Sequence, residues 1–269
     1  MFKHYITHKR GETNADIQDS IDYDLSKGKY AISDGVTQSF IPQIWSKVLV
    51  NHYVSTSENK LTITDDLLKQ FDTAKEQFIH DLDDDQRFFQ ELAEDEFKNA
   101  AATFAGIKIE NHNILWQVIG DSCIFIVSSS GVIRCVNSMP DDIDSKGHIN
   151  MSFDNHPDYI ISNGTIKGSF IEGCCSLDSG WIVMMTDALS SWFITQFNAG
   201  NDPLDILMTL NDIDDFEGFI EKEYRDGRLK SDDSTVLIIS IDSEYKGTNT
   251  KDDYLDNDWI WEILPLWTI

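Results

Sequence analysis

Five aspartates stand next to short apolar segments that have the composition of buried β-strands. Asp34, Asp121 and Asp187 each directly follow such a segment, and the pair Asp232-Asp233 directly precedes one. Carboxylates at strand ends project from rigid elements, so several of them can share one site. Such a site requires a cation that offsets their mutual repulsion, and Mg²⁺ or Mn²⁺ prefers oxygen ligands of this kind. The pattern therefore indicates a metal-dependent enzyme whose site consists of oxygen ligands.

The elements that would carry these aspartates follow from the spacing of apolar residues. Segments with strand-like composition lie at 30–33, 103–109, 114–119, 123–127, 132–136, 181–186 and 235–241. Apolar residues recur with helical spacing at 44–54, 61–82, 88–102, 189–199, 203–210 and 216–224. The polar stretch 137–170 contains several Pro and Gly residues, and it is predicted to be an irregular connection with one or two short strands.

The order of these elements predicts the fold class. Consecutive strands joined by turns such as Asn111-His112-Asn113 and Ser130-Gly131 favour antiparallel pairing. Helices in two blocks, separated by blocks of strands, are typical of an α+β protein. We therefore predict a four-layer α/β/β/α sandwich, in which helices flank two mainly antiparallel sheets and both faces of the apolar strands are buried.

The chain is predicted to form one main domain. Residues 1–243 would make up the catalytic domain, and residues 244–269 an acidic, Trp-containing C-terminal extension packed on the same domain. Trp259, Trp261 and Trp267 in this extension either seal the chain end onto the sandwich or form a partner-binding patch.

Composition and charge exclude several classes of protein. The 269 residues include 47 acidic and 21 basic ones, for a formal charge of −26, which argues against nucleic acid and anionic membrane surfaces as partners. No apolar segment approaches the roughly 20 residues needed to span a bilayer, and the N-terminal residues lack an apolar signal core. The four cysteines form no C-x-x-C pair, so free thiols in a reducing compartment are expected. These observations together predict a cytoplasmic protein.

Six short motifs occur in a fixed order, and most of them lie at predicted strand ends. They are Gln18-Asp19-Ser20, Ser33-Asp34-Gly35-Val36, Ala102-Thr103-Phe104, Ile119-Gly120-Asp121-Ser122, Thr186-Asp187-Ala188-Leu189 and Asp232-Asp233-Ser234-Thr235-Val236. In content and order they resemble the motifs of the metal-dependent Ser/Thr protein phosphatase family, the protein phosphatase 2C type, in a divergent bacterial branch. The resemblance covers about residues 8–242, which is nearly the whole chain.

This resemblance implies a site and a reaction. The metal ligands would be the carboxylates of Asp19, Asp34, Asp187 and Asp232 and the carbonyl of Gly35. Asp34 would bridge two Mn²⁺ or Mg²⁺ ions, Asp34 and Asp187 would be the central catalytic groups, and Asp121 would belong to a third, weaker metal site. Two such ions lower the pKa of a water molecule held between them, and the resulting hydroxide attacks the phosphorus of phosphoserine or phosphothreonine. The implied function is a signalling phosphoprotein phosphatase that is paired with a Ser/Thr kinase.

The sequence departs from the family pattern at three points. The family places a phosphate-gripping arginine a few residues before the first motif aspartate, and here the nearest basic residues are His8, Lys9 and Arg10. Arg10 is assigned as the phosphate-binding candidate, because a bidentate guanidinium is not easily replaced. The usual glycine after the fifth-motif aspartate is Ala188, and the usual glycine-rich stretch after Gly35 is absent.

Other interpretations of the same residues remain open. Asp34-Gly35 is also a turn signal, Asp187 also fits a helix N-cap, and Asp233 would support Asp232 or cap the chain. Thr103 is expected to be a packed strand residue. At the level of function, the alternatives are a catalytically weak pseudophosphatase that acts as a regulatory binding domain, and a phosphohydrolase of small phosphate esters.

Overall fold

The computed structural model describes residues 1–131, 133–138, 141–143, 148–151, 153 and 157–241. The predicted C-terminal extension, with its three Trp residues, and the domain boundary at 243 lie outside these residues, so both stay predictions. Within the described part of the chain, no helix has the length and apolar character needed to cross a membrane.

Two five-stranded sheets form the middle of the molecule. The first sheet has the order β1 (Phe2–Thr7), β15 (Ser234–Ile241), β14 (Gly180–Met185), β7 (Cys123–Ser128) and β8 (Ile133–Val136). The second sheet has the order β13 (Ile171–Ser176), β6 (Asn113–Ile119), β5 (Phe104–Glu110), β3 (Lys29–Ser33) and β2 (Ser20–Asp24). All neighbouring strands in both sheets are antiparallel, as predicted.

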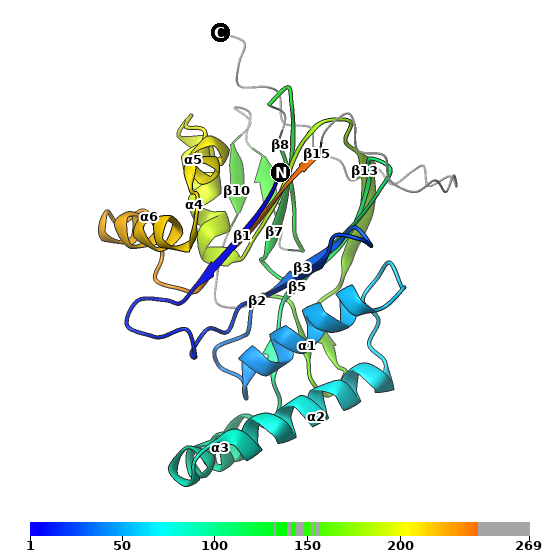
Figure 1. The fold of residues 1–269 in the computed structure, drawn as a ribbon, viewed down its shortest axis with the longest axis vertical. Coiled ribbons are helices and arrows are strands. Elements are labelled where there is room, and N and C mark those ends of the chain that lie inside the picture. Colours follow the sequence, from blue (N-terminus) through cyan, green and yellow to red (C-terminus); the bar gives the residue numbers. More distant parts are fainter. Residues whose placement is uncertain (132, 139–140, 144–147, 152, 154–156, 242–269) are drawn as a thin grey trace.

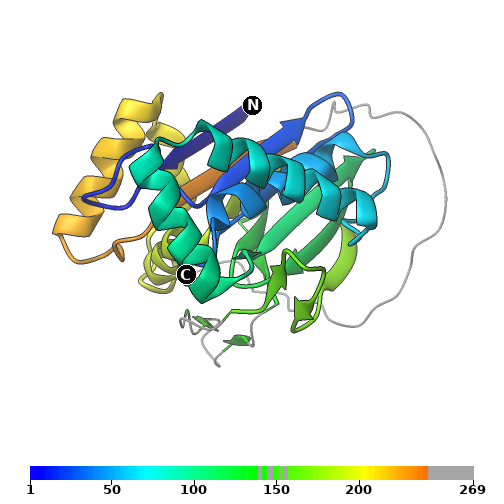
Figure 2. The same ribbon diagram turned by 90° about the horizontal axis from the view of Figure 1, so that it is seen from below.

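Helices cover the outer face of each sheet. The first sheet packs against α4 (Asp187–Asn198), α5 (Pro203–Thr209) and α6 (Ile213–Arg225). The second sheet packs against α1 (Pro42–Ser55), and α2 (Asp65–Asp81) and α3 (Asp84–Phe97) lie beyond it (Figures 1 and 2). The α+β fold class and the four-layer α/β/β/α arrangement are therefore confirmed.

The apolar composition of the central strands follows from burial on both faces. In β14, Val183 and Met185 pack against the helices of the first sheet. Ile182 and Met184, which alternate with them, pack toward the second sheet. A strand covered on both sides needs apolar residues at every position, and this explains why the segment could be recognised from the sequence.

The third predicted helix differs most from the structure. The spacing predicted a helix over 88–102, but α3 begins earlier, at Asp84, because Asp83 forms a capping box with Gln86. The helix ends at Phe97, and the next residue, Lys98, has a positive φ of 60° that does not continue the helix. Residues 101–102 are not helical, since they form the short strand β4 (Ala101–Ala102) and pair with β11 (Tyr159–Ile161).

The second predicted helix differs from the structure in the other direction, because it begins later than expected. The periodic pattern started at residue 61, whereas α2 starts at Asp65. Thr64 is the N-cap, and its side chain accepts a hydrogen bond of 3.2 Å from the backbone N–H of Leu67. Leu61 remains apolar and buried for another reason, because its backbone is held by the side chain of Gln117 in β6.

More short strands are present than the sequence indicated. The connection predicted to hold one or two strands contains β9 (Asp141–Ile143), β10 (Ile149–Met151), β11 and β12 (Ile166–Lys167). The sequence also gave no signal for β1, β2 and β13. These three are edge strands. One side of an edge strand has no neighbour, so its composition is less apolar and its pairing is decided by the strand beside it.

Lys29 in β3 is a buried charge that fixes α1 on the second sheet. Its side chain is 1% exposed, and its ammonium donates to the carbonyls of Tyr53 and Thr56 at the C-terminal end of α1. The ammonium also lies 4.3 Å from the centre of the Tyr53 ring. Burial lowers the pKa of Lys29 to about 8, and the charges of Lys108 and Lys27 act in the same direction.

Lys29 should therefore make the free energy of unfolding increase with pH in the alkaline range. Its folded pKa lies below its unfolded value, so its contribution is complete above pH 10.5 and is lost as the pH falls through about 8. Between pH 7 and pH 9.5, the free energy of unfolding should rise by roughly 2 kcal/mol more in the wild type than in Lys29→Met. Urea unfolding of both proteins at both pH values measures this difference. Parallel pH profiles would contradict the assignment.

Candidate metal centre

The register of the first sheet places three of the sequence motifs at one end. Met185, the last residue of β14, pairs with Val236 near the start of β15 and with Cys123 at the start of β7. The residues that follow or precede these positions are Asp187, Asp232 and Asp121. The sheet therefore brings the three aspartates to the same edge, although they are far apart in the sequence.

The second sheet contributes the other two motif aspartates at the same end. Ser20 of β2 pairs with Ser33 of β3, so Asp19 and Asp34 lie side by side. The pKa of Asp34 is raised well above its usual range, first by burial and then by the negative charges of four neighbours, Asp19, Asp187, Asp121 and Asp232. These five residues are here called the aspartate cluster. The structure thus brings together all the carboxylates that the sequence proposed as ligands.

Asp19 joins the two sheets through hydroxyl groups. Its Oδ2 atom accepts hydrogen bonds from Thr186 Oγ1 at 2.8 Å and from Thr235 Oγ1 at 2.7 Å, and the carboxylate is 4% exposed. Burial and repulsion from Asp233 raise the pKa of Asp19, although the two threonine hydroxyls stabilise its charged form. Both threonines belong to the sequence motifs, but only the folded structure shows that they donate to Asp19.

Thr103 positions Asp34, a role that the sequence did not indicate. The residue is 1% exposed and lies between β4 and β5. Its backbone N–H donates to the carbonyl of Asp34 at 2.8 Å, and its Oγ1 accepts from the backbone N–H of Asp34 at 3.1 Å. The same hydroxyl lies 3.1 Å from Ser122 Oγ, directly after Asp121. Thr103 is therefore more than the packed strand residue that was predicted, because it joins the backbone of Asp34 to Ser122, the neighbour of Asp121.

Asp233 supports the first motif rather than capping a helix. Its two carboxylate oxygens accept the backbone N–H groups of Lys9 at 2.9 Å and of Gln18 at 2.7 Å, and the residue is 4% exposed. These bonds fasten the connection between β1 and β2 immediately before Asp19. Asp233 therefore holds the backbone of the first motif, and its neighbour Asp232 is more exposed at the edge of the cluster.

Asp187 begins α4 but is not its N-cap. The N-cap is Thr186, and Asp187 is the first helical residue, where a negative charge interacts favourably with the helix dipole. Burial and repulsion from Asp232 raise the pKa of Asp187. Ala188, in the place of the usual glycine, is helical and has no positive φ, so the replacement causes no backbone strain.

Gly35 is required for space. A Cβ at this position would lie 2.8 Å from Pro42 Cβ and 2.9 Å from the carbonyl oxygen of Gln18. The backbone around it does not form a hairpin turn, because Gly35 bridges to Ala102 and Val36 donates to the carbonyl of Ala101. The chain therefore continues beside β4, and this keeps the backbone of Asp34 and Gly35 close to the cluster.

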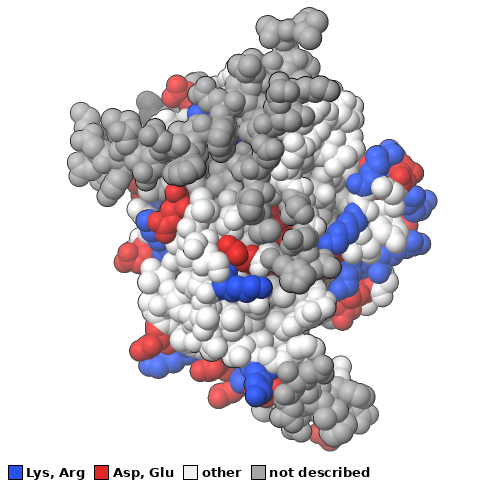
Figure 3. All heavy atoms as spheres, turned by 180° about the vertical axis from the view of Figure 1, so that it is seen from behind, with Lys and Arg blue, Asp and Glu red and all other residues white. Residues whose placement is uncertain are grey.

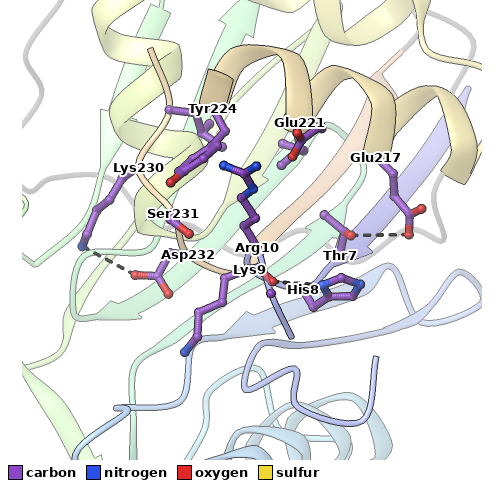
Figure 4. Close-up of a pocket in the computed structure, with 13 residues that line it drawn as sticks. Thr7, His8, Lys9, Arg10, Glu217, Glu221, Tyr224, Lys230, Ser231 and Asp232 are labelled. Atoms are coloured by element: carbon purple, nitrogen blue, oxygen red, sulfur yellow. Dashed lines mark hydrogen bonds and ion pairs between the residues drawn. The ribbon is translucent and has the colours of Figure 1, made fainter. Parts of the chain in front are cut away.

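A cavity of about 200 Å³ opens beside the cluster, between α6 and the connections that precede β2 and β15 (Figure 4). Asp232 and Lys230 line one end of it. Arg10 projects from the opposite wall toward α6, and its guanidinium lies 5.1 Å from the centre of the Tyr224 ring. Arg10 thus lines a cavity next to the cluster, as a phosphate-binding candidate should, although its head group is turned toward α6.

The donor set suits a hard divalent cation. Aspartate oxygens and a nearby glycine carbonyl are the ligands that Mg²⁺ and Mn²⁺ prefer, and the mutual repulsion that raises the aspartate pKa values would be offset by bound positive charge. No three His, Cys, Asp or Glu side chains in the described residues are already arranged to hold one ion. In this structure Asp19 accepts hydrogen bonds from threonine hydroxyls, and Asp187 accepts one from the backbone N–H of Ala188.

Comparison with known proteins supports the fold. No protein-family model and no curated protein matches the sequence. A solved bacterial serine phosphatase matches with a TM-score of 0.54 and 11% identity, over 93% of this chain and 99% of that one. The serine/threonine phosphatase Stp1 from Staphylococcus aureus matches with a TM-score of 0.51 and 13% identity, over 89% and 94% of the two chains.

A further solved bacterial serine phosphatase, which carries a mutation, matches with a TM-score of 0.50 and 14% identity, over 90% of this chain and 98% of that one. The chain therefore has the fold of bacterial Ser/Thr phosphatases along nearly its whole length. The resemblance inferred from the six motifs is confirmed at the level of the fold.

Neutralising Asp34 should stabilise the metal-free protein at neutral pH. The folded pKa of Asp34 is raised, so the contribution of this carboxyl to stability is complete below about pH 4 and is lost as the pH rises through the folded pKa. In the presence of a chelator at pH 8, the free energy of unfolding of Asp34→Asn should exceed that of the wild type by at least roughly 1 kcal/mol. This difference should become smaller at pH 5. Chemical unfolding at both pH values measures it. Equal pH profiles would show that Asp34 carries no repulsion.

Removing the hydroxyl of Thr103 should loosen the site without removing a ligand. Thr103→Val keeps the shape but deletes the acceptor for the Asp34 N–H, so Mn²⁺ affinity should fall about 10-fold or more. Isothermal titration calorimetry measures this affinity. The matched control is Thr195→Val on the exposed face of α4, whose hydroxyl bonds the Ser191 carbonyl at 2.8 Å. If both variants bind Mn²⁺ like the wild type, Thr103 has only a packing role.

Proposed function

We propose that this protein is a metal-dependent phosphoprotein phosphatase that hydrolyses phosphoserine and phosphothreonine. The observation that carries the proposal is the convergence of five aspartates, from the ends of two separate sheets, within a fold of the Ser/Thr phosphatase type. Repulsion among Asp34 and its four neighbours indicates that the cluster is built to hold positive charge.

Asp19, Asp34, Asp187 and Asp232, with the carbonyl of Gly35, would hold two Mn²⁺ or Mg²⁺ ions, and Asp121 would hold a third. When bound, such ions supply Lewis acidity that acidifies an attacking water and offsets charge on the phosphoryl oxygens. The protein supplies rigid positions for the ligands. Thr103 fixes the backbone of Asp34, and the start of α4 fixes Asp187.

The substrate would be a phosphorylated protein produced by a partner Ser/Thr kinase. The cavity beside Asp232 is open toward α6 and contains Arg10, which supports access for a side chain that projects from a peptide. A cationic group in this cavity is notable in a chain with a formal charge of −26, because anions are repelled from most of its surface.

Activity should depend on Mn²⁺ or Mg²⁺ and on the aspartate cluster. Hydrolysis of a phosphothreonine peptide should vanish in a chelator and return with added Mn²⁺. Asp34→Asn and Asp187→Asn should each lower kcat/KM at least about 100-fold, because the amide loses the charge that holds a cation. Asp121→Asn should leave Mn²⁺ binding at the two main positions intact and lower the turnover. Steady-state kinetics with released phosphate as the readout measures these changes.

Asp178→Asn is the matched control for these variants. Asp178 is exposed and lies before β14, at the end of the strand opposite to Asp187, so its neutralisation should leave the kinetics unchanged. Turnover that persists after complete metal removal would exclude the proposed mechanism. Mn²⁺ binding without turnover on any phosphate ester would identify a regulatory binding domain, and turnover restricted to small esters would identify a different phosphohydrolase.

A further inference from the structure

Lys230 carries a positive charge and contacts two members of the aspartate cluster, Asp187 and Asp232. Its Nζ lies 3.3 Å from Asp187 Oδ2. The same Nζ lies 3.6 Å from Asp232 Oδ2 (Figure 4). The sequence motifs gave Lys230 no role, although it stands only two residues before Asp232.

The ion pair itself contributes little to folding stability. The Lys230 side chain is 47% exposed, and ion pairs that involve exposed, flexible side chains are worth at most about 1 kcal/mol. The partners, however, are carboxylates that the proposed function assigns to metal binding. If Asp187 and Asp232 held cations, the ammonium group would lose both partners and lie beside positive charge. It would then be available to bind a different anion at the same place.

The position of Lys230 fits the phosphate group of a substrate. Lys230 and Asp232 line the cavity at its cluster end, so an anion that enters the cavity and approaches the aspartates passes the ammonium. Lysine is a compact charge on a flexible stem, and it can move from a carboxylate to a phosphate oxygen a few ångströms away. Arg10 is placed differently, because its guanidinium lies against Tyr224 and is turned toward α6.

Charge near the site is consistent with this placement. Lys and Arg side chains gather, with acidic ones among them, at the edge of the molecule where α6 lies (Figure 3). Lys222 and Arg225 belong to α6, and Arg228 and Lys230 follow it directly. Arg228 is committed to Glu223 and Asp226, with distances of 2.7 and 2.6 Å. Lys230 is the member of this group that turns to the cluster.

We propose that Lys230 binds the phosphate of the substrate at the aspartate cluster, the role that the family pattern gives to an arginine in the first motif. In the metal-free protein Lys230 forms ion pairs with Asp187 and Asp232 and offsets part of their charge. The inference rests on the proposed function, since it takes the cluster as the place where the phosphoryl group binds.

The test measures the binding of inorganic phosphate, the product, to the Mn²⁺-loaded protein by isothermal titration calorimetry. Lys230→Met should weaken phosphate binding about 10-fold or more, because it removes a charge-assisted hydrogen bond. Lys230→Arg should restore binding to within about 3-fold of the wild type. Mn²⁺ affinity, titrated separately, should be unchanged or higher in Lys230→Met, since the variant removes a competing cation.

Lys222→Met is the control, because Lys222 is an exposed lysine of α6 for which the described residues provide no ion-pair partner. If Lys230→Met and Lys222→Met bind phosphate equally well, Lys230 is only a counter-ion and the inference is wrong. Absence of phosphate binding to the loaded wild type would overturn it as well. Phosphate binding that depends on Lys230, in a protein without turnover, would support the inference and refute the proposed enzymatic function.

Discussion

Repulsion among buried carboxylates is the constraint on which the local structure depends. Asp19, Asp34 and Asp187 lie close together and partly out of water, so their charged forms lose hydration and repel one another. Both effects cost free energy. The neighbouring residues act to hold the charges in position. Thr186 and Thr235 donate hydroxyl hydrogen bonds to Asp19, and Lys230 offsets Asp187. Bound positive charge would offset this repulsion, and this is the part that the proposed function assigns to the metal ions.

The two sheets give this site its rigidity. Each aspartate lies within two residues of a strand that belongs to one of the two five-stranded sheets. Because the side-chain direction alternates along a strand, a slip of one residue in the pairing of β14 with β15 would exchange its two buried faces and displace Asp187 from Asp232. The hydroxyl bonds from Thr186 and Thr235 to Asp19 connect one sheet to the other. The spacing between aspartates of different sheets is thus set by the core between the sheets, not by a flexible loop.

The two sides of the site differ in character. On the inner side, Thr103, Ser122 and Asp233 are buried and fully engaged in hydrogen bonds that fix the backbone of the motifs. On the outer side, Lys230 and Arg10 are exposed on long side chains along a cavity under α6. The site therefore combines a rigid interior with long, exposed side chains at its outer edge.

The sequence by itself determined the main architecture and the identity of the acidic residues. The apolar segments of β3, β7, β14 and β15 were recognisable because these strands are buried on both faces, and motif order alone assigned Asp19, Asp34, Asp121, Asp187 and Asp232 to one site. Tertiary structure decided the edge strands β1, β2 and β13, whose mixed composition acquires a strand conformation only beside a paired neighbour. It also decided the end of α3, where the backbone of Lys98 overrides a helical pattern. The parts played by Thr103, Thr186 and Lys230 were equally out of reach of the sequence. Each depends on contacts between residues that are distant in the chain, and such contacts are fixed by strand register and by the packing of the two sheets.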